Sequence, residues 1–209
     1  VKSLKKFIDS GNEVGNHSFS HFQNFGTLKY KEIKEEIKKT DEIIFEKLNK
    51  KPIGFIAPGW NSSNKVLKAL QSLGYKYDHS LFSSPILLLG LIKMAYNYLK
   101  VLLKFKIPKT YKLKDVFYRA DYYQMFFGST KPYNSINHNY SKKLSFNSKK
   151  GIRVFPIPTK FRIPYWFTLE FTLPKKIVDF IFKINVQNSD FFYVLIHPAD
   201  FLDSNDLKH

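Results

Sequence analysis

Short apolar runs and amphipathic helices alternate along the first 80 residues, and this alternation limits the fold more than any other feature of the sequence. The pattern predicts helices over residues 29–48 and 62–73, and buried strands over residues 52–58 and 75–79. Strand–helix–strand repeats are typical of a parallel sheet covered by helices. The predicted fold class is therefore α/β.

The later part of the chain has weaker periodicity. Residues 107–150 are rich in Tyr, Asn, Ser and Lys, which indicates long loops with short strands. Beyond them we expect a strand over residues 152–157, a helix over residues 173–184 and a buried strand over residues 191–196. We expect one domain over residues 1–209, with an insertion at about residues 81–150.

The charge of the chain is strongly positive, but it comes almost entirely from lysine. There are 34 Lys and Arg against 17 Asp and Glu, a net charge of +17, and Arg occurs only at positions 119, 153 and 162. Specific nucleic-acid readers depend on Arg, so we expect no nucleic-acid partner and favour an anionic membrane surface. A Lys-driven binder of nucleic acid or anionic lipid remains an open alternative. The absence of cysteine excludes a disulfide framework and a thiolate metal site.

An insertion helix over residues 85–104 is long and apolar enough to suggest a membrane span. Lys93 and Lys100 argue against this, because each would cost about 2.5–3.5 kcal/mol near the bilayer centre. They belong to a narrow polar stripe opposite a broad apolar face, formed by Lys93, Asn97, Lys100 and Lys104. Such a helix either lies in a membrane interface or packs on the core of the protein.

Several residues that can carry chemistry follow predicted strands. His17 and His21 form an H-x-x-x-H pair, whose spacing on a helix or tight turn puts both imidazoles within reach of one metal. Two histidines leave a divalent metal under-ligated, and such pairs often have no metal role. Asp78, His197 and the turn at residues 57–60 also end strands, although each has an ordinary structural explanation as a cap, a core histidine or a packed turn. Parallel strands gather their carboxyl ends on one face, so the coincidence favours a site.

Five segments in the same order resemble the polysaccharide deacetylases of the NodB-homology type, carbohydrate esterase family four. They are GNEVGNHSFSH, FIAPGW, LGYKYDHSLF, FPIPT and VLIHPADF. The segments APGW and IPT resemble the branch that removes formyl or acetyl groups from sugars on polyprenyl-phosphate lipids. The resemblance implies a deformed (β/α) barrel.

The same resemblance implies the roles of the site residues. A divalent metal of zinc (Zn) type would be held by His17, His21 and one Asp, and would polarise the amide carbonyl and activate a water. A second Asp would act as the base, His197 would protonate the departing amine, and Asp78 would orient and tune His197. The sugar groove would be lined by Pro58, Gly59 and Trp60, with Trp60 as a stacking face.

Two departures from the family pattern qualify these expectations. The family's Asp-Asp run supplies the third metal ligand and the base, and we expect it upstream of Val1, in a longer protein whose first strands are missing here. Ile56 stands where the family often has Arg. We therefore expect metal-dependent hydrolysis of an N-acyl group from a lipid-linked or cell-envelope sugar, membrane-associated at the cytoplasmic or the extracytoplasmic face. The alternative is a non-catalytic relative that binds glycans or membranes.

Overall fold

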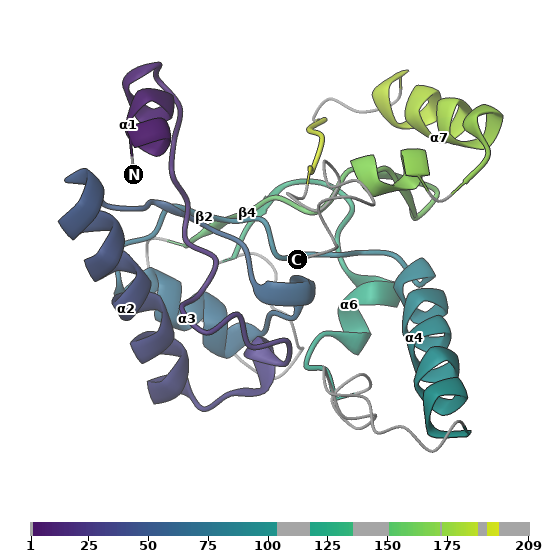
Figure 1. Cartoon of the computed structure of the whole chain (residues 1–209), viewed down its shortest axis with the longest axis horizontal. Helices are drawn as coiled ribbons and strands as arrows, with labels where there is room; N and C mark the ends of the chain where they lie inside the picture. Colours follow the sequence, from purple (N-terminus) through teal and green to yellow (C-terminus); the bar gives the residue numbers. More distant parts are fainter. Residues whose placement is uncertain (1, 104–117, 136–150, 172, 188–191, 197–209) are drawn as a thin grey trace.

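The computed structural model describes residues 2–103, 118–135, 151–171, 173–187 and 192–196 (Figure 1). At its centre lies a small four-stranded sheet in the order β1-β2-β4-β3. Neighbours β1, β2 and β4 are parallel, and β3 runs antiparallel to β4. The strands are β1 (Gly54–Phe55), β2 (Tyr77–Asp78), β3 (Tyr133–Asn134) and β4 (Arg153–Val154).

Two helices pack together beneath this sheet in Figure 1 and enclose the main core. They are α2 (Tyr30–Leu48) and α3 (Asn64–Ser72), and a further helix, α1 (Lys2–Asp9), precedes them. The core side chains come from both helices, from the strands and from the 3₁₀ helix η1 (Phe25–Thr27), and include Phe25, Ile33, Ile37, Phe55, Val66, Leu67, Leu70 and Val154. The predicted mixed α/β class is confirmed, and both helices lie where the periodicity placed them.

The ends of these helices follow from local chemistry. At the start of α2 the backbone N–H of Lys29 donates to the Glu32 carboxylate at 2.7 Å, which satisfies one exposed donor of the first turn. After α3 the chain turns at Gly74, whose φ of +81° is costly for any residue with a Cβ. The turn at Gly74 directs the chain from α3 into β2.

A second group of elements lies on the opposite side of the molecule from α2 (Figure 1). It contains α4 (Ile86–Leu103), α6 (Tyr122–Phe127), α7 (Lys175–Gln187), the hairpin β5 (Thr159–Lys160) with β6 (Ile163–Pro164), and the 3₁₀ helix η3 (Phe167–Phe171). A separate small core joins α7 to η3 and the end of the hairpin, with Tyr165, Leu169, Val178 and Ile181 buried. Within the described ranges, no helix combines the length and the hydropathy required to cross a bilayer.

Two sequence predictions differ from the structure. Residues 122–127 form the helix α6, although the segment was expected to be loop and strand. Residues 192–196 form no strand, and the side chains of Val194 and Ile196 are 41% and 48% exposed. The prediction of a buried strand is therefore wrong for these residues, since none of their side chains is buried. An apolar run forms a strand only beside a hydrogen-bonded neighbour, and no described strand pairs with it.

Candidate functional site

The loop that carries the two histidines starts at the edge of the central sheet. Asn16 forms a parallel bridge with Phe55, and the Ile56 N–H donates to the Asn16 carbonyl at 3.1 Å. Beyond Asn16 the chain turns, with positive φ at Ser18 (63°) and His21 (54°). This turn, rather than a helix, brings the rings of His17 and His21 to a centroid distance of 4.8 Å, at 69° to each other.

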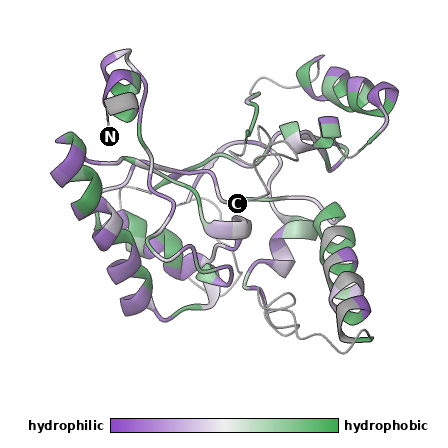
Figure 2. Ribbon diagram, viewed as in Figure 1, coloured by the Kyte–Doolittle hydropathy of each residue, from purple (hydrophilic) through white to green (hydrophobic). Residues whose placement is uncertain are grey.

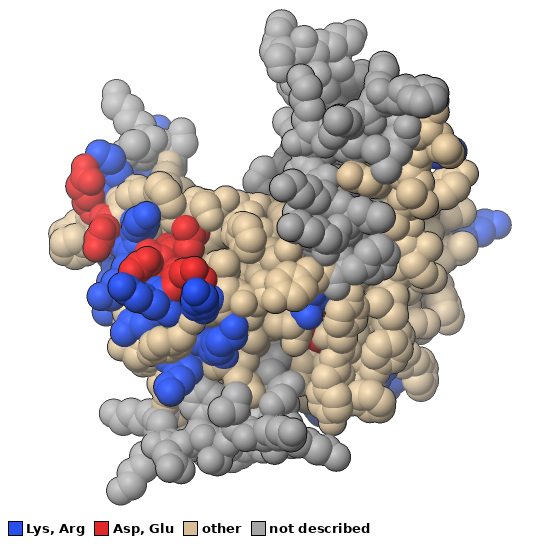
Figure 3. Space-filling view, turned by 90° about the horizontal axis from the view of Figure 1, so that it is seen from below, with Lys and Arg blue, Asp and Glu red and all other residues tan. Residues whose placement is uncertain are grey.

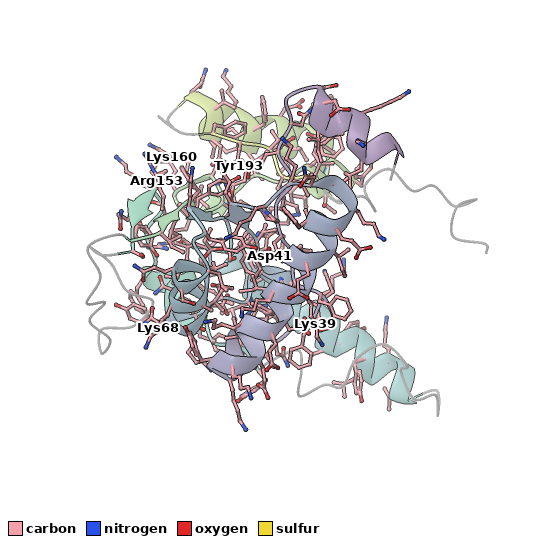
Figure 4. The ribbon with its side chains drawn as sticks, turned by 90° about the vertical axis from the view of Figure 1, so that its left-hand side faces the viewer. Lys39, Asp41, Lys68, Arg153, Lys160 and Tyr193 are labelled. Carbon is pink, nitrogen blue, oxygen red and sulfur yellow. The ribbon has the colours of Figure 1, made fainter. Side chains whose placement is uncertain are left out.

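Asn16 also holds the start of this loop against α2. Its side chain is buried and donates to Asp41 Oδ1 and to the Ile37 carbonyl, both at 2.9 Å, while its Oδ1 accepts from the Ser18 N–H at 2.8 Å. The Tyr75 hydroxyl donates to the same Asp41 carboxylate, and burial together with Asp41 raises the pKa of Tyr75. Asp41, on the inner side of α2 (Figure 4), therefore serves the fold of the loop.

The orientation of His17 is set by the backbone of the next strand segment. Its Nδ1 lies 2.7 Å from the Ile56 carbonyl oxygen. A carbonyl oxygen can only accept, so Nδ1 carries the proton and the ring's lone pair is on Nε2. Histidine ligands of metals are commonly held in this way, with one nitrogen donating to a carbonyl and the other facing the metal.

His21 has an amide neighbour that can serve the same purpose. Gln23 Nε2 lies 3.2 Å from His21 Nδ1. Rotating this amide by half a turn would place Oε1 there, where it would accept from a protonated Nδ1 and leave the lone pair on Nε2. Gln23 can thus support either tautomer of His21.

Both imidazoles line a cavity of about 650 Å³. Its other walls come from η2 (Pro58–Trp60), from η3 and from the end of the described chain: Gln23, Ile56, Ala57, Gly59, Trp60, Trp166, Thr168, Leu195 and Ile196. Trp60 and Trp166 both pack edge-on against the buried ring of Phe82, at centroid distances of 5.1 and 5.9 Å. The cavity therefore combines two imidazoles with two indoles held in fixed positions.

The turn that presents Trp60 is strained and supported from outside. Gly59 and Trp60 have φ of 57° and 55°, and the left-handed region costs a residue with a Cβ about 1–2 kcal/mol. Arg119 Nη2 donates to the Gly59 carbonyl at 2.9 Å and to Asp121 Oδ2 at 2.7 Å. In the part of the chain that the structure describes, the buried indole Nε1 of Trp60 has no hydrogen-bond partner.

Comparison with known proteins agrees with the motifs. Residues 1–77 match the family model for polysaccharide deacetylase. A peptidoglycan deacetylase from Helicobacter pylori is 38% identical over 80 residues, which are 38% of this chain and 27% of that protein. The chain thus spans about a quarter of the length of this curated relative.

Two solved structures are also similar to parts of this chain. A CE4 family pseudoenzyme from Bacillus anthracis is 31% identical, with 35% of this chain and 26% of that chain covered and a TM-score of 0.33. A structure from Mycobacterium smegmatis assigned to the polysaccharide deacetylases is 14% identical, with 75% and 35% covered and a TM-score of 0.44. Both TM-scores are below 0.5, so neither superposition defines the fold of this chain.

The structure brings some of the predicted deacetylase residues together. His17, His21, Gly59 and Trp60 line the same cavity, and Pro58 is buried in the turn beside them. His197 lies outside the described residues, but Ile196, which precedes it, lines the cavity. These positions are consistent with a common site.

Asp78 takes a different position. It is fully buried at the end of β2, is not among the residues that line the cavity, and accepts hydrogen bonds from the Ser80 N–H at 3.1 Å and from the Ser80 hydroxyl. The Ser80 hydroxyl also accepts from the Ala57 N–H at 2.8 Å. Asp78 is thereby connected to the strand that leads into the Pro58–Trp60 turn.

The residues of this segment fit part of a metal site. Zinc in a catalytic site takes three protein ligands, and His17 and His21 supply two nitrogens from one loop. Among the described residues, no three His, Asp or Glu side chains are grouped closely enough to hold a metal. The donor pair therefore suits zinc chemistry, and a third ligand has to come from elsewhere.

Some site residues could not be predicted from the sequence. Trp166 and Thr168 reach the cavity only through tertiary packing, whereas Gln23 lies two residues from His21 in the same loop. Arg119 had one signal, because arginine is rare in this lysine-rich chain and a buried bidentate pair requires its planar guanidinium.

Proposed function

We propose that this chain carries the histidine ligands and the sugar cleft of a metal-dependent carbohydrate deacetylase, which hydrolyses an N-acyl group from a sugar. One observation supports this most directly. His17 and His21 converge at 4.8 Å, and the Ile56 carbonyl holds His17 with its Nε2 lone pair available for ligation. The match of residues 1–77 to the polysaccharide deacetylase family model supports the same assignment.

The cavity has the size and chemistry expected for a sugar. Its volume of about 650 Å³ falls within the range of small-molecule sites. The indoles of Trp60 and Trp166 line the cavity and offer apolar faces for a pyranose ring. Thr168 adds a hydroxyl on the same wall.

A divalent metal of zinc type, held by His17, His21 and a carboxylate from outside the described residues, would polarise the acyl carbonyl and lower the pKa of its bound water. The Ile56 carbonyl keeps His17 in the ligating tautomer. His197 follows Ile196 at the cavity wall, and we assign it the proton delivered to the departing amine, since an amide nitrogen leaves only when protonated. Asp78 would orient His197.

The proposal extends to the substrate, namely to the acyl group, which is acetyl or formyl, and to the molecule that carries the sugar. The APGW and IPT segments support a lipid-linked sugar, and a cell-envelope glycan is the other substrate class. Either substrate fits an enzyme that works beside a membrane, at its cytoplasmic or its extracytoplasmic face.

A second candidate function is a non-catalytic relative that binds glycans. It is favoured by Ile56, which cannot provide the charge of the arginine that the family often has at this position. It is also favoured because, among the described residues, no Asp or Glu side chain joins His17 and His21 in a group that could hold a metal.

The test uses the whole protein and two readouts, bound metal by mass spectrometry and amine release from an N-acetylated oligosaccharide. The wild type should hold about one divalent ion per site, and His17→Ala should lose both the ion and the amine release. His79→Gln, which changes a histidine outside this cavity, should keep the metal. Metal content and turnover that survive His17→Ala would refute the site. Oligosaccharide binding without amine release would favour the non-catalytic candidate.

A further inference from the structure

Helix α4 exposes a continuous line of large apolar side chains, here called the α4 seam. Its members are spaced alternately three and four residues apart, so they share one side of the helix. Their exposed fractions range from 49% to 79%, and the seam consists of Leu89, Ile92, Tyr96, Leu99 and Leu103. On another side of the helix Leu91 is buried, at 5% exposed. Helix α4 therefore packs on the protein with one side and leaves the seam outside.

Positive charge borders the seam. Lys93 and Lys100 are both exposed, lie seven residues apart and fall along the same edge of the seam. The Lys100 Nζ lies 4.7 Å from the centroid of the Tyr96 ring, within cation–π range. The sequence contains no Asp or Glu between Asp78 and Asp115. The whole of α4 is thus free of acidic residues.

On the face seen from below, the distribution of charge distinguishes the side of α4 from the side of α2. Viewed from below, Lys, Arg, Asp and Glu crowd together on the side of α2, while the surface on the side of α4 is mostly uncharged (Figure 3). Apolar residues run along α4, whereas α2 is largely polar (Figure 2). Mixed charges are typical of a surface that faces water, and an apolar seam with a cationic edge is typical of a helix in a membrane interface.

The three–four spacing would also suit a second helix, but the charges oppose pairing between two copies. In an antiparallel pair the lysine edges would face each other, and in a parallel pair each lysine edge would meet a side of α4 that carries no acid. Phosphate headgroups supply the negative charge that a second copy lacks. We propose that α4 lies in the surface of an anionic lipid bilayer, with the α4 seam among the acyl chains and Lys93 and Lys100 at the headgroups.

The dimensions agree with this orientation. The seam extends over about 21 Å, from the 14 steps of 1.5 Å between Leu89 and Leu103, so an interfacial helix of this length has a long line of contact with the bilayer. In Figure 1, α4 lies at the edge of the molecule, away from the central sheet. The proposal uses neither the cavity nor a metal, so it stands independently of the proposed activity.

The test is sedimentation of the whole protein with vesicles of phosphatidylcholine alone or mixed with phosphatidylglycerol. We expect binding to the mixed vesicles that weakens with salt, and much less binding to phosphatidylcholine. Lys93→Gln/Lys100→Gln should lower the partition coefficient about 25-fold, the product of two roughly fivefold losses. Ile92→Asp should lower it roughly tenfold or more, because it puts a carboxylate in the seam.

The matched control is Lys31→Gln/Lys38→Gln, which removes two exposed lysines from α2. It should leave vesicle binding nearly unchanged, and circular dichroism should show that every variant is folded. Failure of the wild type to bind the mixed vesicles would overturn the proposal. So would an equal loss in the α2 control, which would indicate attraction by net charge alone. The proposal would also be overturned if the wild type were a dimer, and if Ile92→Asp dissociated this dimer without changing vesicle binding. That result would assign the seam to contact with a second copy of the chain.

Discussion

Replacing Arg119 by methionine should destabilise the protein by about 3–5 kcal/mol, because it leaves a buried carboxylate without its partner. The side chains of Arg119 and Asp121 are only 7% and 3% exposed. The guanidinium donates to both carboxylate oxygens, at 2.9 and 2.7 Å, and also to the Gly59 carbonyl at 2.9 Å. Methionine fills a similar volume but makes none of these three bonds.

The free energy of unfolding from urea titration is the measurement. Burial raises the pKa of Asp121 and Arg119 counteracts this, so the carboxyl in Arg119→Met should protonate more readily. The difference in the free energy of unfolding between the wild type and Arg119→Met should therefore be smaller at mildly acidic pH. The double variant Arg119→Met/Asp121→Leu removes both charges and should recover most of the loss. A single-variant loss below about 1 kcal/mol, typical of exposed pairs, would refute the account of a buried pair that supports the cavity.

Two further predictions concern the packing beneath the site. Gly54→Ala should cost about 1–3 kcal/mol in urea titration, because its Cβ would overlap the Tyr77 ring, and Gly15→Ala, whose Cβ would meet only the Gly54 carbonyl group, should cost less. An equal loss in both would count against that close contact. Burial lowers the pKa of His79 to about 4, from 6.5, so the unfolded chain binds the proton first and stability should fall by about 3 kcal/mol as pH drops from above 6.5 to about 4. His79→Gln should flatten this part of the stability–pH curve, and an unchanged curve would contradict the buried neutral imidazole.

Helices were predictable from the sequence where one apolar face repeats. α2 (Tyr30–Leu48) and α4 (Ile86–Leu103) lie within two residues of their predicted bounds, because periodicity over so many turns leaves little freedom. The strands were located but predicted too long, since strand length depends on hydrogen-bonded neighbours that are remote in sequence. The run at residues 192–196 shows the same limit, because apolar composition alone does not supply a partner strand.

For the site, the sequence indicated the histidine pair but not its surroundings. His17 and His21 are only four residues apart, so a local turn is enough to bring their rings together, and in the structure they form a close pair in a loop. The contributions of Trp166 and Arg119 depend on contacts between distant segments, which no local pattern records. The assignment to the polysaccharide deacetylases came from motifs in a fixed order, and the match of residues 1–77 to the family model confirms it.

The most direct test of the account is a crystal structure of the whole protein loaded with zinc. The account predicts one ion about 2.0–2.1 Å from a ring nitrogen of His17 and of His21, with Ile56 still accepting from His17 Nδ1 and with a carboxylate among the remaining ligands. An ion bound elsewhere, or one that touches a single imidazole of the pair, would contradict it.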